Sequence, residues 1–331
     1  MIIESRAYAR AGLLGNPSDG YFGKTISVIV KNFGATVTLY HTPELVIDGS
    51  DEDNNRFRSI HHLADTVRQK GYYGGRRLLK AVVKRFREHC VETGIRLPNR
   101  NFTIAYRTSI PRQVGLAGSS AIMTAAIRAL MQFYDVSIPR EEIPNIVLAA
   151  EKDELGINAG LQDRVIQTYE GCVFMDFDRE YLERHGHGRY ETIDPALLPR
   201  LYLAYKTDLS KVSGTVFNNL KERFDKGDET VLATLVQLAE LAEQGKNAIL
   251  ERNCDLLSEL IDRNFDLRCK IMNISDSNME LVAAARRAGA SAKFTGSGGA
   301  IIGAYRSDDT LRKLIVNLKK INARVVKPYI V

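Results

Sequence analysis

Apolar positions recur at helical spacing within residues 111–134, directly after a stretch that alternates like a strand. Residues 101–107 place an apolar side chain at every second position, which predicts a β-strand. Residues 111–121 are rich in small side chains, and the apolar positions that follow repeat at i, i+4. The pattern therefore predicts a strand, a small-residue loop and a helix with one buried face. That face is formed by Ile122, Met123, Ala126, Ile127, Leu130 and Met131.

This succession of elements is typical of an anion-binding site. Small side chains let the backbone approach a ligand, and the first N–H groups of a helix have no partner within it. The positive end of the helix dipole lies at the same place, and phosphate is the anion most often held there. An ordinary turn with Ser119 or Ser120 as the helix N-cap explains the loop equally well, so the loop alone leaves both interpretations open.

The same patterns predict an α+β fold of mixed strands with helices packed on one side. Residues 7–25 are dense in glycine and polar side chains, far more so than a hairpin needs, and residues 178–199 are predicted to be irregular. A domain boundary near the end of that irregular segment divides the chain into residues 1–196 and 197–331. Strands are predicted at 26–30, 35–40, 44–47, 172–177, 201–205, 300–305 and 324–327, and helices at 78–90, 141–154, 229–251, 255–271, 278–288 and 308–320.

Composition narrows the functional class. The 331 residues carry a net charge of +6, but the basic residues are scattered and form no stripe with interleaved aromatics. Nucleic-acid binding is therefore disfavoured, whereas phosphorylated or carboxylated small molecules fit a basic protein. The four cysteines lie far apart without metal-ligand spacing, which favours the reducing cytoplasm. No run of about 18 apolar residues exists, so no membrane segment is predicted.

A second glycine-rich turn follows Phe294. Gly298 and Gly299 in this turn can adopt positive φ and bring their N–H groups against a ligand. Together with the loop at 115–120, the turn at 296–299 suggests two half-sites for one polyanion. The Gly23-Lys24-Thr25 sequence is not a Walker P-loop, because its earlier glycine is missing and no strand-then-helix context surrounds it.

A third candidate for a part of the functional site is the sequence Gln162-Asp163-Arg164. Asp163 could orient or deprotonate an acceptor hydroxyl, and Arg164 could offset phosphate charge, as phosphoryl transfer requires. The alternative is a surface ion pair that contributes little to stability. Mg²⁺ needs few protein ligands because it keeps several waters, and Ser120 with Glu151 would suffice.

Three motifs in order resemble the GHMP kinases, which include galactokinase, homoserine kinase and mevalonate kinase. RAGLLGNPSD at 10–19 is similar to their first motif, residues 111–121 are similar to P-x-x-x-G-L-(G/A)-S-S-A, and residues 293–300 to the glycine-rich third motif. Within the superfamily, stretches such as GYYGGRRLL, AGLQDRV, GHGRY and NFDLR resemble the plant-type glucuronokinases. The resemblance implies a ribosomal-S5-domain-2-like N-terminal domain and a ferredoxin-like C-terminal domain. It also implies ATP- and Mg²⁺-dependent phosphorylation of D-glucuronate at its anomeric hydroxyl.

The resemblance assigns a role to each matching residue. Asp163 would be the catalytic base, and Arg10, the other catalytic residue, would line the sugar site beside Asp19. Ser120 and Glu151 would bind the metal. The remaining substrate contacts would be Arg164, Gly296, Ser297 and Gly298. ATP would be bound by Pro111, Gly115, Leu116, Ala117, Gly118, Ser119, Ser120 and Ala121.

Departures from the family patterns leave several choices open. The second motif carries one extra residue, so Ser119 competes with Ser120, and Glu154 competes with Glu151 for the metal. Asn16-Pro17 replaces the Glu-His of galactokinases, which disfavours galactose.

The substrate carboxylate calls for an arginine. Arg164 is placed first because it adjoins the base, followed by Arg112 and Lys24, while Tyr72 or Tyr73 could stack on adenine. Other uronic acids, fucose, a heptose phosphate or a non-catalytic ATP and sugar sensor are the rival functions. The expected partners are small molecules, and the chain would act as a monomer or homodimer.

Overall fold

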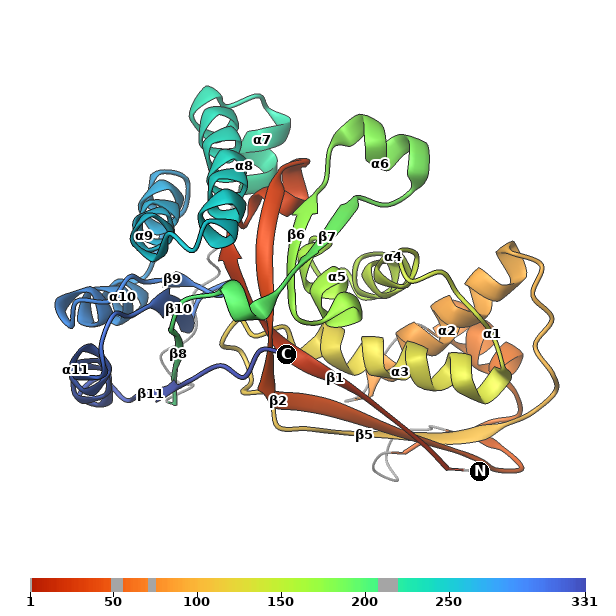
Figure 1. Cartoon of the computed structure of the whole chain (residues 1–331). Helices are drawn as coiled ribbons and strands as arrows, with labels where there is room; N and C mark the ends of the chain where they lie inside the picture. The colour runs from red at the N-terminus through yellow and green to blue at the C-terminus, as the bar shows by residue number, and fades with distance from the viewer. Residues whose placement is uncertain (1, 49–55, 71–75, 208–219) are drawn as a thin grey trace. The chain divides into compact units, whose positions relative to one another are not determined.

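The computed structural model of the chain describes residues 2–48, 56–70, 76–207 and 220–331 (Figure 1). The predicted adenine contacts Tyr72 and Tyr73 lie outside these residues. The chain divides into two compact units, each built from separate segments. Unit 1 comprises Met1–Ala9, Phe33–Ile110 and Gly118–Thr168, and unit 2 comprises Arg10–Asn32, Pro111–Ala117 and Tyr169–Val331. The division at residue 196 inferred from the sequence stays a prediction.

The two long N-terminal strands run through both units. These strands are β1 (Ile2–Leu14) and β2 (Lys24–His41). In unit 1, β5 (Phe102–Thr108) pairs antiparallel with residues 35–41 of β2 and parallel with β3 (Leu45–Ile47), which pairs with β4 (Arg56–Phe57). The helical segments of this unit are α1 (Ile60–Lys70), α2 (Arg77–Glu92), α3 (Gly118–Tyr134), α4 (Ile143–Ala149), a π-helical turn (Ala150–Glu154) and α5 (Gln162–Tyr169).

The core of unit 1 confirms the predicted strand, loop and helix. Phe102 of β5 packs edge-on against Phe133 of α3, with ring centroids 5.4 Å apart. Both side chains are almost completely buried, as are Ile122 and Leu130 on the same face of the helix. Burial of such apolar faces is the main force that fixes helix α3 on the sheet.

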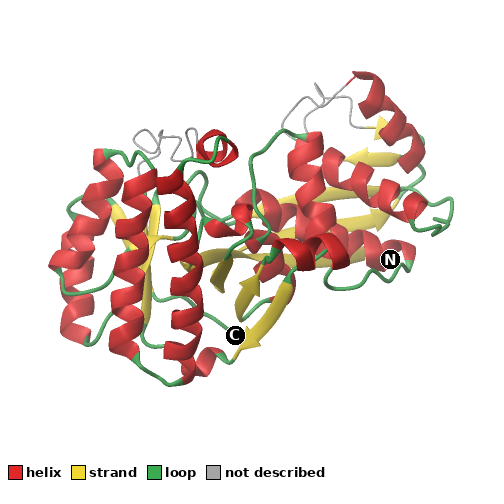
Figure 2. Cartoon of the chain, turned by 90° about the horizontal axis from the view of Figure 1, so that it is seen from above, coloured by secondary structure: helices red, strands yellow, loops and turns green. Residues whose placement is uncertain are grey.

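Unit 2 contains a second, four-stranded antiparallel sheet in the order β11-β8-β10-β9. The chain runs from β8 through helices to β9, directly into β10, then through α11 to β11. This βαββαβ succession is the ferredoxin-like arrangement that the resemblance implies. Figure 2 shows helices over one face of this sheet. Its elements are β8 (Leu201–Lys206), α7 (Leu220–Asp225), α8 (Glu229–Leu250), α9 (Cys254–Ile271), α10 (Asp276–Arg287), β9 (Lys293–Phe294), β10 (Ala300–Ala304), α11 (Asp308–Lys319) and β11 (Ala323–Val326).

The segment 7–25 runs from β1 through a loop with a short 3₁₀ turn (Ser18–Tyr21) into β2. The prediction of an irregular segment at 178–199 was wrong. The segment 178–199 contains α6 (Arg179–His185) and β7 (Arg189–Ile193), which pairs with β6 (Cys172–Asp176). Helix α6 forms because Asp178 caps the amide of Tyr181 and Gly186 ends the helix with a φ of +75°.

The predicted break between residues 30 and 35 is also absent, because β2 is continuous there. Gly34 donates its N–H to Ser109 Oγ, and the Ser109 amide donates to Gly34 O over 2.9 Å. These bonds supply the backbone partners that a strand requires at a glycine. None of the described helices combines the length and apolar character that crossing a membrane requires.

Candidate active site

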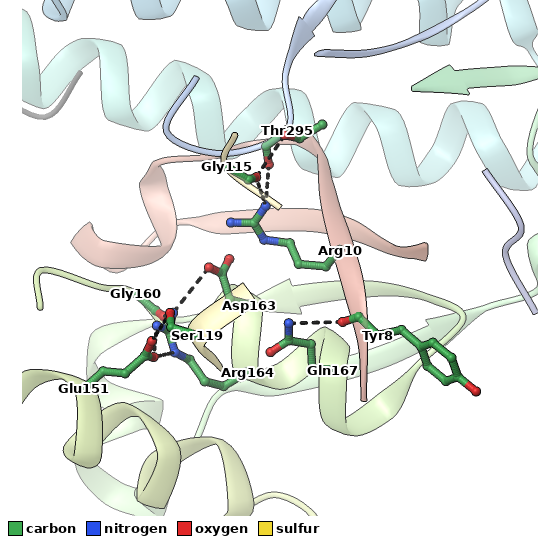
Figure 3. A network of polar contacts seen from close by, with 10 residues as sticks. All are labelled: Tyr8, Arg10, Gly115, Ser119, Glu151, Gly160, Asp163, Arg164, Gln167 and Thr295. Atoms are coloured by element: carbon green, nitrogen blue, oxygen red, sulfur yellow. Dashed lines mark hydrogen bonds and ion pairs between the residues drawn. The ribbon is translucent and has the colours of Figure 1, made fainter. Parts of the chain in front are cut away.

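Four polar side chains of unit 1 form one network at the starts of two helices (Figure 3). Ser119 lies in the first turn of α3, Glu151 in the π-helical turn, and Asp163 and Arg164 in the first turn of α5. Ser119 Oγ donates to Glu151 Oε1 over 2.7 Å, and Arg164 Nε donates to Glu151 Oε2 over 2.6 Å. The network therefore joins three segments that are distant in the sequence.

Arg164 is the centre of this network. Its side chain is only 4% exposed, and that of Glu151 is fully buried. Besides Glu151, the guanidinium donates from Nη1 to Gly160 O over 2.6 Å and lies 3.5 Å from Asp163 Oδ2. The guanidinium thus fixes both carboxylates, which leaves it poorly placed to bind a substrate carboxylate as the sequence analysis expected.

The structure separates the two competing serines. Helix α3 begins at Gly118, so Ser119 and Ser120 both lie inside the first turn and neither is the N-cap. Ser120 is completely buried, whereas the hydroxyl of Ser119 faces Glu151. The structure therefore pairs Glu151 with Ser119 through this hydrogen bond, and the assignment of Ser120 to the metal stays a prediction.

The oxygen atoms of Ser119 and Glu151 suit Mg²⁺. Neighbouring ligands of an octahedral magnesium ion lie about 3 Å apart, close to the 2.7 Å between these two oxygens. Glu154, the rival carboxylate, instead forms an ion pair with Lys84. Within the described ranges, no group of three or more His, Cys, Asp or Glu side chains could hold a metal, so this site would keep most of its ligands as water.

A second network lies in unit 2 and joins the three sequence motifs. Arg10 donates from Nη1 to Gly115 O over 2.6 Å and to Thr295 O over 3.1 Å. Thr295 Oγ1 also donates to Gly115 O, over 3.0 Å. Because Arg10 is only 4% exposed, its guanidinium works as a backbone clamp between the two glycine loops (Figure 3).

The glycine loops approach each other closely, as the two-half-site hypothesis requires. Gly115 has a φ of +68°, and a Cβ added there would lie 2.9 Å from Gly298 O and 3.0 Å from Ser297 N. Gly298 and Gly299 adopt positive φ values of 115° and 80°, which confirms their predicted conformation. Only glycine at 115 allows this contact between backbones.

Asp19, the predicted sugar ligand, lies in the 3₁₀ turn of unit 2. Burial, reinforced by the charges of Asp19 and Asp225, raises the pKa of the neighbouring Tyr21 to about 12. Of the other predicted carboxylate ligands, Lys24 forms an ion pair with Glu243 at 2.7 Å and Arg112 is exposed.

Arg268 is fully buried beside the third motif and donates to Gly296 O. The sequence marked it only as the last residue of the stretch NFDLR and assigned it no role. The available signal is the pair Asn264 and Arg268, four residues apart and hence on one face of α9.

Comparison with known proteins matches both halves of the chain to one family. Residues 77–171 match the GHMP kinases N terminal domain, and residues 240–323 match the GHMP kinases C terminal domain. The chain is 47% identical to glucuronokinase 1 of Arabidopsis thaliana over 91% of its own length and 84% of the relative's. It is also 47% identical to probable glucuronokinase 2 of the same plant, with the same coverage.

A solved structure supports the fold. The crystal structure of Lactococcus lactis galactokinase complexed with galactose covers 99% of this chain, and 93% of that chain is matched. The TM-score is 0.77 at 14% sequence identity. The architecture is therefore the GHMP kinase fold, with its N- and C-terminal domains.

Proposed function

Because the chain belongs to the GHMP kinase family, we propose that it phosphorylates D-glucuronate at the anomeric hydroxyl with ATP and Mg²⁺. The chain is a sugar kinase, as its 47% identity to a plant glucuronokinase over most of both sequences shows. Our proposal is more specific than a sugar kinase, because it names glucuronate as the acceptor and its anomeric hydroxyl as the phosphorylated group. The 47% identity to the plant glucuronokinase supports both choices. The observation that carries the catalytic roles is the network that joins Ser119 and Asp163 to the buried pair Glu151 and Arg164.

In the proposed reaction, Asp163 is the general base. It accepts the proton of the anomeric hydroxyl while the hydroxyl oxygen forms a bond to the γ-phosphorus and the bond to the ADP oxygen breaks. An anomeric hydroxyl is more acidic than other sugar hydroxyls, so one positioned carboxylate suffices. Arg164 holds the Asp163 carboxylate within 3.5 Å of its Nη1, which fixes the base before the substrate binds.

The second motif binds the phosphates of ATP in this proposal. Backbone N–H groups of residues 115–121 and the start of helix α3 supply donors and the positive end of a helix dipole. Ser119 and Glu151 would hold Mg²⁺, which neutralises charge on the β- and γ-phosphates when bound. Arg10 keeps the phosphate loop against the third motif through Gly115 and Thr295.

We also place the reaction in the cytoplasm. All four cysteines are free thiols, two of them buried and two exposed. Free thiols on the surface are expected where the compartment is reducing.

A coupled ADP-release assay tests the proposal directly. MgATP is offered with glucuronate, galacturonate, glucose, galactose, fucose and mevalonate, and the phosphate position in the product is assigned by ³¹P and ¹³C NMR. We expect turnover with glucuronate and a product phosphorylated at C1. Turnover with a neutral sugar alone would overturn the substrate, and sugar-independent ATP binding without turnover would favour the sensor.

A further inference from the structure

Three cationic side chains are buried together in unit 2. Arg10 is 4% exposed, and Arg268 and Lys293 are completely buried. The hydrogen bonds of Lys293 go to Gly12 O over 2.7 Å and to the side-chain oxygen of Asn16. In the described part of the chain, Arg268 donates only to a backbone carbonyl, that of Gly296, over 2.9 Å. Positive charge is thus concentrated here, and the hydrogen bonds of Arg268 and Lys293 go to neutral acceptors.

Two hydrogen-bond donors of the Arg268 guanidinium are unsatisfied in the described structure. Its Nε and Nη1 atoms are buried and have no hydrogen-bond partner among the described residues. Its guanidinium also packs over the ring of Phe294, 5.4 Å from the centroid. A buried charged donor without an acceptor is strongly unfavourable, so each such group calls for a partner from outside the protein chain.

The electrostatic surroundings also call for an anion. Burial, and to a smaller degree the charge of Arg10, lowers the pKa of Arg268 to about 10, against the opposing effects of Cys269 and Asp19. Burial followed by the charges of Arg268 and Arg10 lowers the pKa of Lys293 well below its ordinary value. An anion bound here would relieve the repulsion among these cations.

Helix α9 connects Arg268 to the loop between β1 and β2, which carries the proposed sugar ligand Asp19 and is called the sugar-binding loop here. Asn264, one turn earlier, accepts the Gly15 amide on its Oδ1 over 2.7 Å and donates from Nδ2 to Asn16 O over 3.4 Å. The same loop continues into Asp19, whose charge acts on Arg268. In contrast, the second motif, which is proposed to bind the ATP phosphates, is held at Gly115 by Arg10. The unpartnered donors of Arg268 therefore belong with the sugar-binding loop.

We propose that Arg268 binds the carboxylate of the sugar acid and so makes the enzyme selective for a uronate. The inference rests on the proposed function and names the residue that the sequence analysis left open. Lys293 supports the arrangement by holding the loop backbone at Gly12 and the side chain of Asn16. A phosphate of the nucleotide is the other anion that could accept from Arg268, and the experiment separates the two.

The test compares glucuronate with D-glucuronamide, a neutral analogue of the same shape, in the wild type and in Arg268→Gln. We expect the ratio of kcat/KM for glucuronate to that for glucuronamide to fall by about 30-fold or more in the variant, the usual effect of truncating one partner of a buried charge pair. The KM for ATP should change little. Arg268→Lys keeps the charge but changes its geometry, and should lower the ratio by a smaller factor.

Arg286→Gln is the matched control. Arg286 also packs over a phenylalanine of unit 2, Phe265, at 5.2 Å, but its charge is paired with Asp262 and Asp266. This variant should leave the ratio unchanged.

Three outcomes would count against the inference. An unchanged ratio in both Arg268 variants would overturn it while leaving the glucuronate kinase in place. A raised KM for ATP with an unchanged ratio would assign Arg268 to the nucleotide. Absence of glucuronate turnover in the wild type would instead reject the proposed function itself, and with it the uronate carboxylate as the partner of Arg268.

Discussion

Arg164 donates from Nε to Oε2 of Glu151 over 2.6 Å, and both side chains are almost completely buried. Removing the guanidinium would leave a buried carboxylate without its counter-charge. We therefore expect Arg164→Met to lower the free energy of unfolding by about 3–5 kcal/mol, measured by urea denaturation. Lys221→Gln is the control, because it breaks an exposed ion pair with Asp225. It should change the free energy of unfolding by less than about 1 kcal/mol. A similar small change in Arg164→Met would contradict the central role of this pair.

Asp163→Asn tests the proposed base. The amide keeps the size of the side chain but accepts a proton poorly, so we expect kcat to fall by about 10²-fold or more. The affinity for ATP, measured by calorimetry without the sugar, should stay close to that of the wild type. Asp153→Asn changes an exposed carboxylate of the nearby π-helical turn and should keep wild-type turnover. Wild-type turnover in Asp163→Asn would remove this residue from the base role.

Ser119→Ala tests which serine serves the metal. Its hydroxyl lies 2.7 Å from Glu151 Oε1, so we expect the variant to need about tenfold more Mg²⁺ for half-maximal activity, the equivalent of about 1.4 kcal/mol. Ser120→Ala is the control, because its side chain is completely buried. A raised Mg²⁺ requirement in Ser120→Ala alone would restore the assignment made from the sequence.

Local patterns predicted most of the regular elements, because these elements bury apolar side chains, on one face in a helix such as α11 and on both faces in strands β8 and β10. Helices α8 to α11 and strands β8, β10 and β11 lie within a few residues of their predicted bounds. Helix α6 (Arg179–His185) was not predicted from the sequence. It buries none of its residues, so it has no apolar stripe to show in the sequence, and only its capping residues Asp178 and Gly186 mark it.

The motifs of the candidate site could be located from the sequence, but their side-chain partners could not. The choice between Ser119 and Ser120 depends on where α3 begins, and one residue of shift rotates a helical side chain by about 100°. Arg164 follows Asp163 in the sequence, yet it points toward Glu151, which lies on another segment. Arg268 contacts a backbone carbonyl, and a backbone partner leaves no complementary residue type to recognise.

Gly115→Ala tests the close approach of the two glycine loops. A methyl group there would lie 2.9 Å from Gly298 O while the backbone keeps a φ of +68°. The control is Gly94→Ala, which has a φ of +73° and no atom within 4 Å of the added Cβ. We expect the control to lose about 1–2 kcal/mol of stability from its conformation alone, and Gly115→Ala to lose more and to raise the KM for ATP. Equal losses with an unchanged KM would show that the loops do not depend on this contact.

The buried thiol of Cys172 makes the free energy of unfolding fall as pH rises in the alkaline range. Burial raises the pKa of its thiol to about 12 from an ordinary value of 9.0. Above about pH 9 the unfolded chain loses this proton while the folded chain keeps it, so the unfolded state binds fewer protons and stability falls as pH rises. Between about pH 8 and about pH 10.5 the wild type should therefore lose about 2 kcal/mol more than Cys172→Ala, by urea denaturation at each pH. Cys254→Ala, which removes an exposed thiol, should keep the wild-type slope. Parallel slopes for wild type and Cys172→Ala would mean that this thiol ionises equally in both states.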